Sequence, residues 1–450
     1  MATGPLLLLY FFLAIALLLL SIIKYKINPF LALLGTAIVT GLLVMMPLKD
    51  IAGNIAAGFG NTLRGIGIVI GLGIILGQVL SEAHATDQIA HGMLEKFGER
   101  KAPTALAFSG YLISIPVFMD AAFVIMMPLA RKLARITKTS ALTMITALAV
   151  STVTTHAMVI PTPGPAAVAG NMKVDFGLFI LYGMIVAFPA VLVGALLYGK
   201  SLRNRFPMQT ENNIALDSDE NESNNDNRPS LSLSLFTLLL PILLILIGSI
   251  LNFILPKGSS LGMFSAFIGD KNIALFIGVV VAILALKKYF KRSLDEIIVE
   301  AAAASGMILL ITGAGGSFGT IINQSGIGKF FVETMGNLNI SPIILGWVLS
   351  QILRSAQGST TVALITTSSI LGPVAAQMGA SPILVGLAIC AGGIGLSLPN
   401  DSGFWVVSRF GGLSVQDTFR TWTVGGTLSG LTGLLMVLIL SIFSGVLPGL

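Results

Sequence analysis

Charged residues are scarce in this chain of 450 residues. Lys, Arg, Asp and Glu together make up 10% of it, against about 25% in soluble domains. Hydrophobic residues supply 54%, and the mean hydropathy is +0.91. So few charges on so apolar a chain exclude an ordinary soluble domain and predict a membrane protein that crosses the bilayer several times.

Ligands for metals and disulfides are almost missing. The one cysteine, Cys390, lies within an apolar run, and the histidines His84, His91 and His156 are too few and too scattered for a metal cluster. A disulfide needs two cysteines, and a structural metal site needs several ligands together. We therefore expect no disulfide, no metal site and no cofactor. The chain also lacks a P-loop pattern, which argues against an ATP-driven pump.

The basic residues are confined to short loops between apolar segments. The net charge of +6 is therefore better explained by the positive-inside rule than by nucleic-acid binding. We expect a lipid bilayer and no nucleic acid as partner, in the inner (plasma) membrane, with both termini outside. No basic residue precedes the apolar run over residues 5–23 and no small-residue cleavage site follows it, so we expect a retained helix rather than a signal peptide.

One polar segment divides the chain. Residues 207–230 are rich in Asp, Glu, Asn and Ser and poor in apolar residues, which is typical of a disordered linker. We predict a first transmembrane repeat over residues 1–206, a disordered acidic cytoplasmic linker over residues 207–230, and a second, inverted transmembrane repeat over residues 231–450.

Four apolar segments are interrupted. Residues 102–130 and 341–377 each consist of two arms shorter than the about 20 residues that cross a bilayer, so they predict two re-entrant hairpins. Residues 140–176 and 382–407 are broken by prolines and polar residues, so they predict two broken transmembrane helices.

The two halves match element for element. Each contains two helices, a Gly-rich helix, a hairpin, a broken helix and a final helix. We expect the first Gly-rich helix over residues 65–81, after a separate amphipathic stretch over residues 51–64. An odd number of crossings in each half gives the halves opposite orientations. The fold class is therefore an all-α polytopic membrane protein with an inverted structural repeat, which is typical of secondary transporters with a site at the membrane midplane. The Gly-rich helices could pack within the protomer or in a homo-oligomer.

Ionisable residues at the interruptions are few, and each is unfavourable in a low-dielectric interior unless it is paired or used. Arg354 suits a substrate carboxylate, or it could be a structural partner of Asp120 or Asp401. Asp120, Asp401 and His156 are the candidates for the coupling proton. Asp120 could instead neutralise Arg354, Asp401 could cap a half-helix, and His156 could be a structural residue or bind a substrate hydroxyl.

Uncharged groups near these residues could also bind substrate. They are Gly358, Ser359, Thr360, Thr155, Thr162 and Asn400. Half-helix N-termini over residues 358–361 and near Pro165 would favour an anion. Such a site suits a small hydroxylated carboxylate.

Several short motifs also carry a family resemblance. They are FVIMMPL over residues 123–129, Thr155-His156 with PGP over residues 163–165, GSTTVA over residues 358–363 and NDSGFW over residues 400–405. Here, and over the whole chain apart from the acidic linker, the sequence resembles the gluconate:proton symporter family of bacterial inner-membrane permeases. The resemblance implies proton-coupled import of gluconate or a related sugar acid, although some relatives carry D-serine or other small hydroxy acids.

Two residues depart from the pattern of the gluconate members. This chain has Met119-Asp120 where they tend to have Tyr-Glu, and Thr162 where they tend to have His. Both changes fall in the expected site, so the substrate could be a shorter or longer acid.

We therefore predict a secondary active transporter, not an enzyme, that imports gluconate or a related small hydroxy-carboxylate by proton symport. One alternative is a sodium-coupled carboxylate carrier, because the polar hairpin tips could coordinate sodium. The other is an intramembrane aspartyl hydrolase that uses Asp120 and Asp401 as paired acids.

Overall fold

The computed structural model describes residues 4–205, 228–256, 259–328, 330, 334, 341–375, 379–399 and 401–450. Every regular element in this part of the chain is a helix, which confirms the all-helical prediction. The predicted acidic linker falls outside the described residues as far as residue 227, and so does Asn400.

The helices follow one another through short connections. Before the linker they are α1 (Pro5–Ile23), α2 (Pro29–Leu43), α3 (Leu48–Glu82), α4 (Ala85–Phe97), η1 (Glu99–Lys101), α5 (Ala102–Ile113), α6 (Met119–Thr137), α7 (Ala141–Met158), α8 (Pro163–Met172), α9 (Phe176–Val191), η2 (Leu192–Leu197) and α10 (Tyr198–Arg205). After it they are α11 (Leu231–Ile254), α12 (Ser260–Ile268), α13 (Lys271–Leu286), η3 (Lys287–Tyr289), α14 (Leu294–Gln324), α16 (Pro342–Gln357), α17 (Thr360–Ala375), α18 (Pro382–Gly392), α19 (Ser402–Gly411), α20 (Val415–Thr418), η4 (Phe419–Thr423) and α21 (Val424–Ile442). Both η2 and η4 are single π-helical turns.

Within the described residues, eight helical segments are long and apolar enough to cross a membrane. They include α1, α3, α11, α14 and the interrupted pair α7–α8. Shorter apolar helices, among them α5, α16, α17 and α18, lie between them. The chain is therefore a multi-span membrane protein.

Helix α3 differs from the sequence-based expectation. It is one continuous helix of 35 residues, whereas we expected an amphipathic stretch over residues 51–64 and a separate helix over residues 65–81. The expected division was wrong because no proline follows Pro47 in this segment, and an interior glycine costs only about 1 kcal/mol relative to alanine. At about 1.5 Å per residue the helix is roughly 50 Å long, which exceeds the about 30 Å of a hydrocarbon core.

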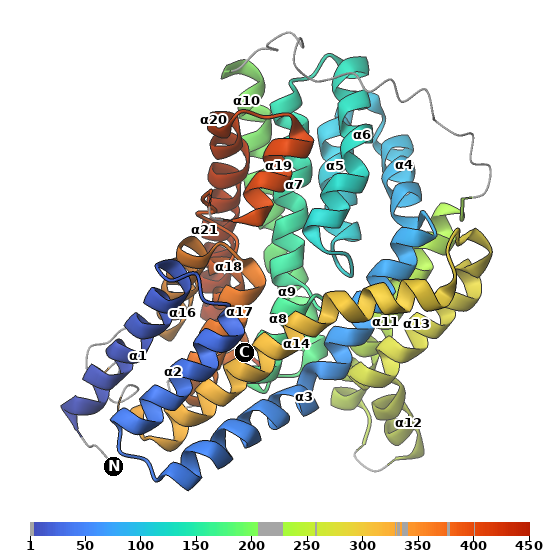
Figure 1. Cartoon of the computed structure of the whole chain (residues 1–450). Coiled ribbons are helices and arrows are strands. Elements are labelled where there is room, and N and C mark those ends of the chain that lie inside the picture. The colour runs from blue at the N-terminus through green and yellow to red at the C-terminus, as the bar shows by residue number, and fades with distance from the viewer. Residues whose placement is uncertain are drawn as a thin grey trace.

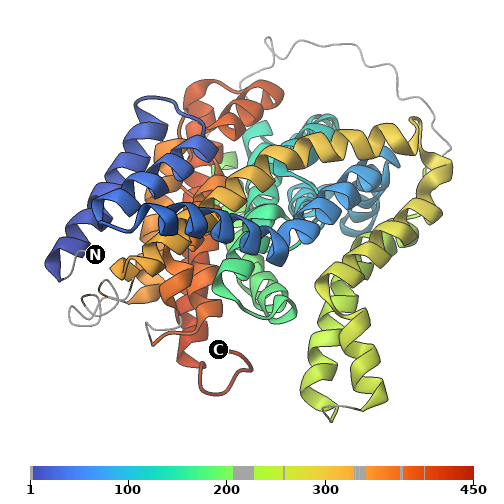
Figure 2. The ribbon, with the colours of Figure 1, turned by 60° about the horizontal axis from the view of Figure 1, so that its bottom comes forward.

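The two long helices α3 and α14 pack against each other along the lower part of the molecule (Figures 1 and 2). A Cβ added to Gly58 in α3 would lie 2.5 Å from the carbonyl oxygen of Gly316 in α14. A Cβ added to Gly316 would lie 2.0 Å from Oγ1 of Thr62. Glycine at these two positions therefore lets the backbones touch, and this contact between the Gly-rich helices lies within one protomer.

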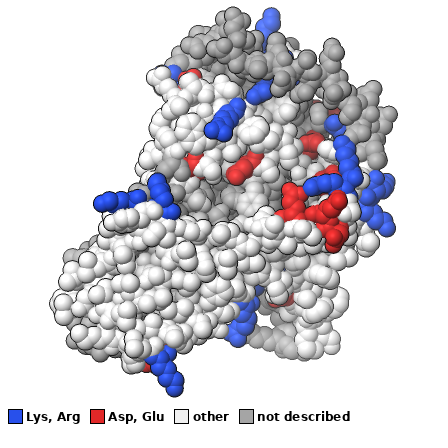
Figure 3. Space-filling view, in the orientation of Figure 1, with Lys and Arg blue, Asp and Glu red and all other residues white. Residues whose placement is uncertain are grey.

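The surface has a broad uncharged region. Figure 3 shows it over the lower part of the view, where α1, α2, α3 and α14 lie in Figure 1, with Lys and Arg at its edges and higher up. Large apolar side chains are exposed on these helices, for example Leu13, Leu31, Ile68 and Met307. Lipid tails stabilise such a surface, whereas water does not.

Candidate functional site

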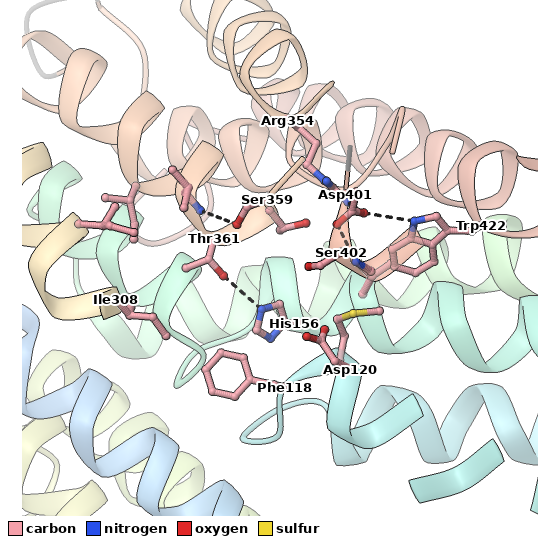
Figure 4. Close-up of a pocket in the computed structure, with 17 residues that line it drawn as sticks. Phe118, Asp120, His156, Ile308, Arg354, Ser359, Thr361, Asp401, Ser402 and Trp422 are labelled. Atoms are coloured by element: carbon pink, nitrogen blue, oxygen red, sulfur yellow. Dashed lines mark hydrogen bonds and ion pairs between the residues drawn. The ribbon is translucent and has the colours of Figure 1, made fainter. Parts of the chain in front are cut away.

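A cavity of about 280 Å³ lies where the interrupted segments meet. Its walls come from the start of α6, the end of α7, one face of α14, the end of α16, the start of α17, the start of α19 and η4. Its polar and aromatic lining residues are Phe118, Asp120, His156, Arg354, Ser359, Thr360, Thr361, Asp401, Ser402 and Trp422. Figure 4 shows Phe118, Asp120 and His156 on one side and Arg354, Asp401 and Trp422 on the other.

Asp120 reaches the cavity from the first turn of α6 and is exposed. A carboxylate is favoured there because the helix N-terminus carries a partial positive charge. The turn between α5 and α6 lies against α3, where a Cβ added to Gly77 would be 2.4 Å from the carbonyl oxygen of Pro116. The missing side chain of Gly77 therefore lets this turn come close to α3.

His156 lies in the last turn of α7 and is only 4% exposed. Its Nε2 is 3.4 Å from Oγ1 of Thr361, and its ring lies 5.4 Å from the ring of Phe118, centroid to centroid. Its Nδ1 has no hydrogen-bond partner in the part of the chain that the structure describes. Neutral imidazole can donate or accept a hydrogen bond, so this nitrogen is available to a ligand.

The link between α7 and α8 is closed by Thr162. Its hydroxyl donates to the carbonyl oxygens of His156, at 2.8 Å, and Val159, at 2.6 Å. The same link lies against α3, where a Cβ added to Gly73 would be 2.7 Å from the carbonyl oxygen of Pro161. Thr162 thus satisfies carbonyls that the helix break would leave unpaired.

Arg354 and Asp401 form a buried ion pair. Nη2 of Arg354 lies 2.6 Å from Oδ2 of Asp401, and the residues are 1% and 4% exposed. Arg354 lies in the last turn of α16, where the helix dipole favours a positive charge. The helix ends at Gly358, whose φ of +82° is strained for other residues and whose N–H donates to the carbonyl oxygen of Arg354 at 2.9 Å. Of the two predicted partners of Arg354, the structure brings Asp401 into contact and not Asp120.

Asp401 also caps α19, as predicted. Its Oδ1 accepts a hydrogen bond from the N–H of Gly403 at 2.8 Å. Oδ2 accepts a second hydrogen bond from Ser397, besides that from Arg354. Nε1 of Trp422, in turn, donates to Oγ of Ser397 at 2.6 Å. Asp401 is thus held by donors from four different parts of the chain.

Part of the Arg354 guanidinium is left for a ligand. Its Nε and Nη1 are buried and have no hydrogen-bond partner among the described residues. Unsatisfied buried donors on a charged group are strongly unfavourable. A carboxylate placed beside them would satisfy them in the planar geometry that arginine prefers.

Three helices begin at the cavity wall. They are α6, α17 and α19, through Asp120, Thr360 and Ser402. Their N-terminal N–H groups favour a bound anion. Helix α8 was expected to do the same near Pro165, but its first turn lies away from the wall.

The structure brings together most of the predicted site residues. Asp120, His156, Arg354, Ser359, Thr360 and Asp401 line the cavity. Gly358, Thr155 and Thr162 do not line it: Gly358 ends α16, Thr162 closes the α7–α8 link, and the Thr155 hydroxyl is buried with no partner among the described residues. Asn400 is outside the described residues.

Sequence reasoning missed several residues of the site. Phe118, Trp422, Ser402 and Ser397 line the cavity or support its wall. A buried Trp needs an acceptor for its indole N–H, and this was the one signal that could have identified Trp422. Ile308 and Ile311 reach the cavity from α14, and nothing local distinguishes them from lipid-facing residues.

The fold and the cavity define a membrane transporter of the secondary-carrier type, with a polar cavity inside an apolar helical shell. The chain belongs to the GntP permease family: the family described as "GntP family permease" matches residues 6–443. This is a family of transporters, so the aspartyl hydrolase alternative is excluded.

Two relatives from Escherichia coli K12 are each 33% identical to the chain. The "High-affinity gluconate transporter" matches over 430 residues, which is 95% of this chain and 97% of that protein. The "Gnt-II system L-idonate transporter" matches over 429 residues, which is 94% of this chain and 96% of that protein. The family relationship therefore extends over nearly the full length of the chain.

The fold is similar to that of a solved transporter. The crystal structure of the Alcanivorax borkumensis YdaH transporter matches with a TM-score of 0.61 and 17% identity, over 89% of this chain and 90% of that one. The similarity supports the same arrangement of helices.

Proposed function

We propose that the protein imports gluconate or a closely related small hydroxy-carboxylate together with protons, by secondary active transport. The observation that carries the proposal is Arg354, a buried cation with free Nε and Nη1 donors at the wall of an otherwise enclosed polar cavity. Relatives named for gluconate and L-idonate transport support the same class of substrate.

The other lining residues suit a polyhydroxylated acid. Hydroxyl groups of Ser359, Thr360, Thr361 and Ser402 border the cavity, and each can donate or accept a hydrogen bond. The rings of Phe118 and Trp422 offer apolar faces to the C–H groups of a sugar acid. The volume of about 280 Å³ is near the lower end of small-molecule pockets, which run from about 300 Å³ upwards, so the substrate is small.

The architecture offers a route for alternating access. We propose that α5–α6 and α16–α17 are re-entrant hairpins, that α7–α8 and α18–α19 are broken transmembrane helices, and that the two halves form an inverted repeat in the inner membrane. The linker would then be cytoplasmic and both termini outside. In secondary transporters one such bundle rocks against the other around a fixed site.

The test is uptake of labelled gluconate into liposomes that contain the purified protein. We expect accumulation driven by an inward proton gradient, abolished by a protonophore and competed by unlabelled aldonates. A sodium gradient imposed at equal pH on both sides should drive none. Uptake that follows sodium alone would replace the proton by sodium in the proposal. Liposomes carrying the Arg354→Gln variant serve as the inactive control.

A further inference from the structure

Two carboxylates border the cavity, and their surroundings differ. Oδ2 of Asp401 accepts hydrogen bonds from Arg354 and Ser397, and Oδ1 accepts one from the N–H of Gly403. Trp422 donates to the Ser397 oxygen, so the hydroxyl proton of Ser397 remains available for Asp401. Every group placed around Asp401 is thus a donor, and a carboxylate is the form that can accept from all of them.

Protonation of Asp401 would also leave Arg354 without its counter-charge. The two side chains are buried, and Asp401 is the carboxylate that pairs with Arg354 among the described residues. A buried ion whose partner is removed is strongly destabilised. Asp401 is therefore poorly suited to take up and release a proton during each transport cycle.

Asp120 is placed differently. It is exposed at the cavity wall, while Asp401 is 4% exposed. Asp120 is close enough to Arg354 and Asp401 to interact with their charges, yet it is not ion-paired with Arg354. An exposed carboxyl group can exchange its proton with water that enters the cavity.

His156 is the third titratable group on the wall. It is 4% exposed, and its neighbours on other elements are the hydroxyl of Thr361 and the ring of Phe118. No ion pair joins it to a carboxylate in the portion of the chain that is described. A protonated imidazole would therefore be a buried cation without an anionic partner, which is unfavourable.

We propose that Asp120 takes up the coupling proton and that Asp401 stays a carboxylate, so that one proton enters with each substrate anion. The charged wall residues are one cation, Arg354, and two anions, Asp120 and Asp401. A substrate carboxylate would add another negative charge to this small space. A proton on Asp120 cancels that addition, so the net charge of the cavity is the same before and after both are bound. The inference rests on the proposed function.

The experiment measures gluconate affinity and proton uptake together. Purified protein in detergent is titrated with gluconate between pH 5.5 and 8, with tryptophan fluorescence as the signal and a pH-indicator dye in weak buffer. For wild type we expect about one proton taken up per gluconate bound. Where Asp120 is ionised before binding, we expect affinity to fall by up to about tenfold per pH unit as the pH rises.

Variants separate the three candidates. Asp120→Asn should bind gluconate with no pH dependence and no proton uptake, and in liposomes it should exchange labelled for unlabelled gluconate without gradient-driven accumulation. Asp120→Glu should restore the pH dependence, and His156→Gln should keep it. Asp401→Asn should lose binding at every pH. The exposed Asp50, in the first turn of α3, provides the control variant Asp50→Asn, which should behave like wild type.

Three results would overturn the inference while leaving the proposed function in place. They are Asp120→Asn accumulating gluconate in response to a proton gradient, Asp401→Asn binding gluconate without pH dependence, and wild type binding gluconate without proton uptake while still accumulating it. A wild-type protein that neither binds nor accumulates gluconate or its competitors would instead overturn the proposed function itself, and the inference with it. Proton uptake is measured on the unmodified protein, so the outcome does not depend on any variant folding.

Discussion

The indole nitrogen of Trp422 lies 2.6 Å from the hydroxyl oxygen of Ser397. Trp422 belongs to the π-helical turn η4, and Ser397 belongs to the irregular link between α18 and α19. The two segments are joined a second time, because Oγ1 of Thr423 donates to the carbonyl oxygen of Ser397 at 2.5 Å. Since Ser397 donates to Asp401, the end of η4 helps to fix the carboxylate that pairs with Arg354.

Replacing Ser397 tests whether this support matters for transport. Ser397→Ala removes a hydrogen bond to a charged group, which is typically worth about 1.5–3 kcal/mol. We therefore expect the KM for gluconate to rise about tenfold or more. Ser397→Thr keeps the hydroxyl and should largely restore the KM. Ser444→Ala, at an exposed position near the C-terminus, is the matched control. An unchanged KM in Ser397→Ala would show that Asp401 is positioned without it.

Arg354→Lys tests whether the guanidinium shape is needed. Lysine keeps the positive charge opposite Asp401, but it lacks the planar arrangement of donors represented by the free Nε and Nη1. We expect kcat/KM for uptake to fall at least tenfold with little change in protein yield. Arg409→Lys, at an exposed position at the end of α19, should have no effect. Normal uptake by Arg354→Lys would remove Arg354 from substrate binding.

The ion pair itself is tested by a pair of variants measured for stability. Asp401→Asn leaves the Arg354 cation buried and uncompensated, and we expect a loss of about 3–5 kcal/mol. Asparagine can still cap α19, so the loss reports on the charge. The double variant Arg354→Met with Asp401→Asn should recover most of the thermal unfolding midpoint, yet it should not transport. If the double variant is as unstable as Asp401→Asn alone, the hydrogen bonds of Asp401 and not its charge stabilise the fold.

Two glycines in α3 give a matched comparison of packing. A Cβ at Gly77 would meet the carbonyl oxygen of Pro116 at 2.4 Å, whereas a Cβ at Gly71 would meet no atom within 4 Å. Gly77→Ala should destabilise the protein by about 1–3 kcal/mol through overpacking and reduce uptake, because the displaced turn carries Asp120. Gly71→Ala should be neutral or stabilise by about 0.5–1 kcal/mol. Equal thermal midpoints for the two variants would contradict this packing.

Much of the fold could be predicted because its signals are local. The prolines near residues 161–165 remove donors that a helix needs, and α7 does end at Met158 before α8 begins at Pro163. The continuous helix α3 could not be predicted in the same way. Its glycines weaken a helix locally, and their compensation comes from contacts with α14, Pro116 and Pro161, which are distant in sequence.

The site could be predicted in its residues more than in its pairings. A charge inside an apolar segment is unfavourable unless it is used, so Asp120, His156, Arg354 and Asp401 could each be identified in isolation. The choice of Asp401 over Asp120 as the partner of Arg354 depends on how α16 and α19 pack, and no local pattern encodes it. The inverted repeat and the membrane sides of the loops stay predictions.

The cavity draws its titratable wall, with Asp120 and His156, from before the linker and its ion-paired wall, with Arg354 and Asp401, from after it. A ligand that touches both walls becomes part of the contact surface between the two portions of the chain. Its length then sets how far apart the walls can stand. Acids one carbon shorter or longer than the natural substrate would therefore be poor cargo even if they bind, and an acid too long for the walls to approach each other would act as an inhibitor.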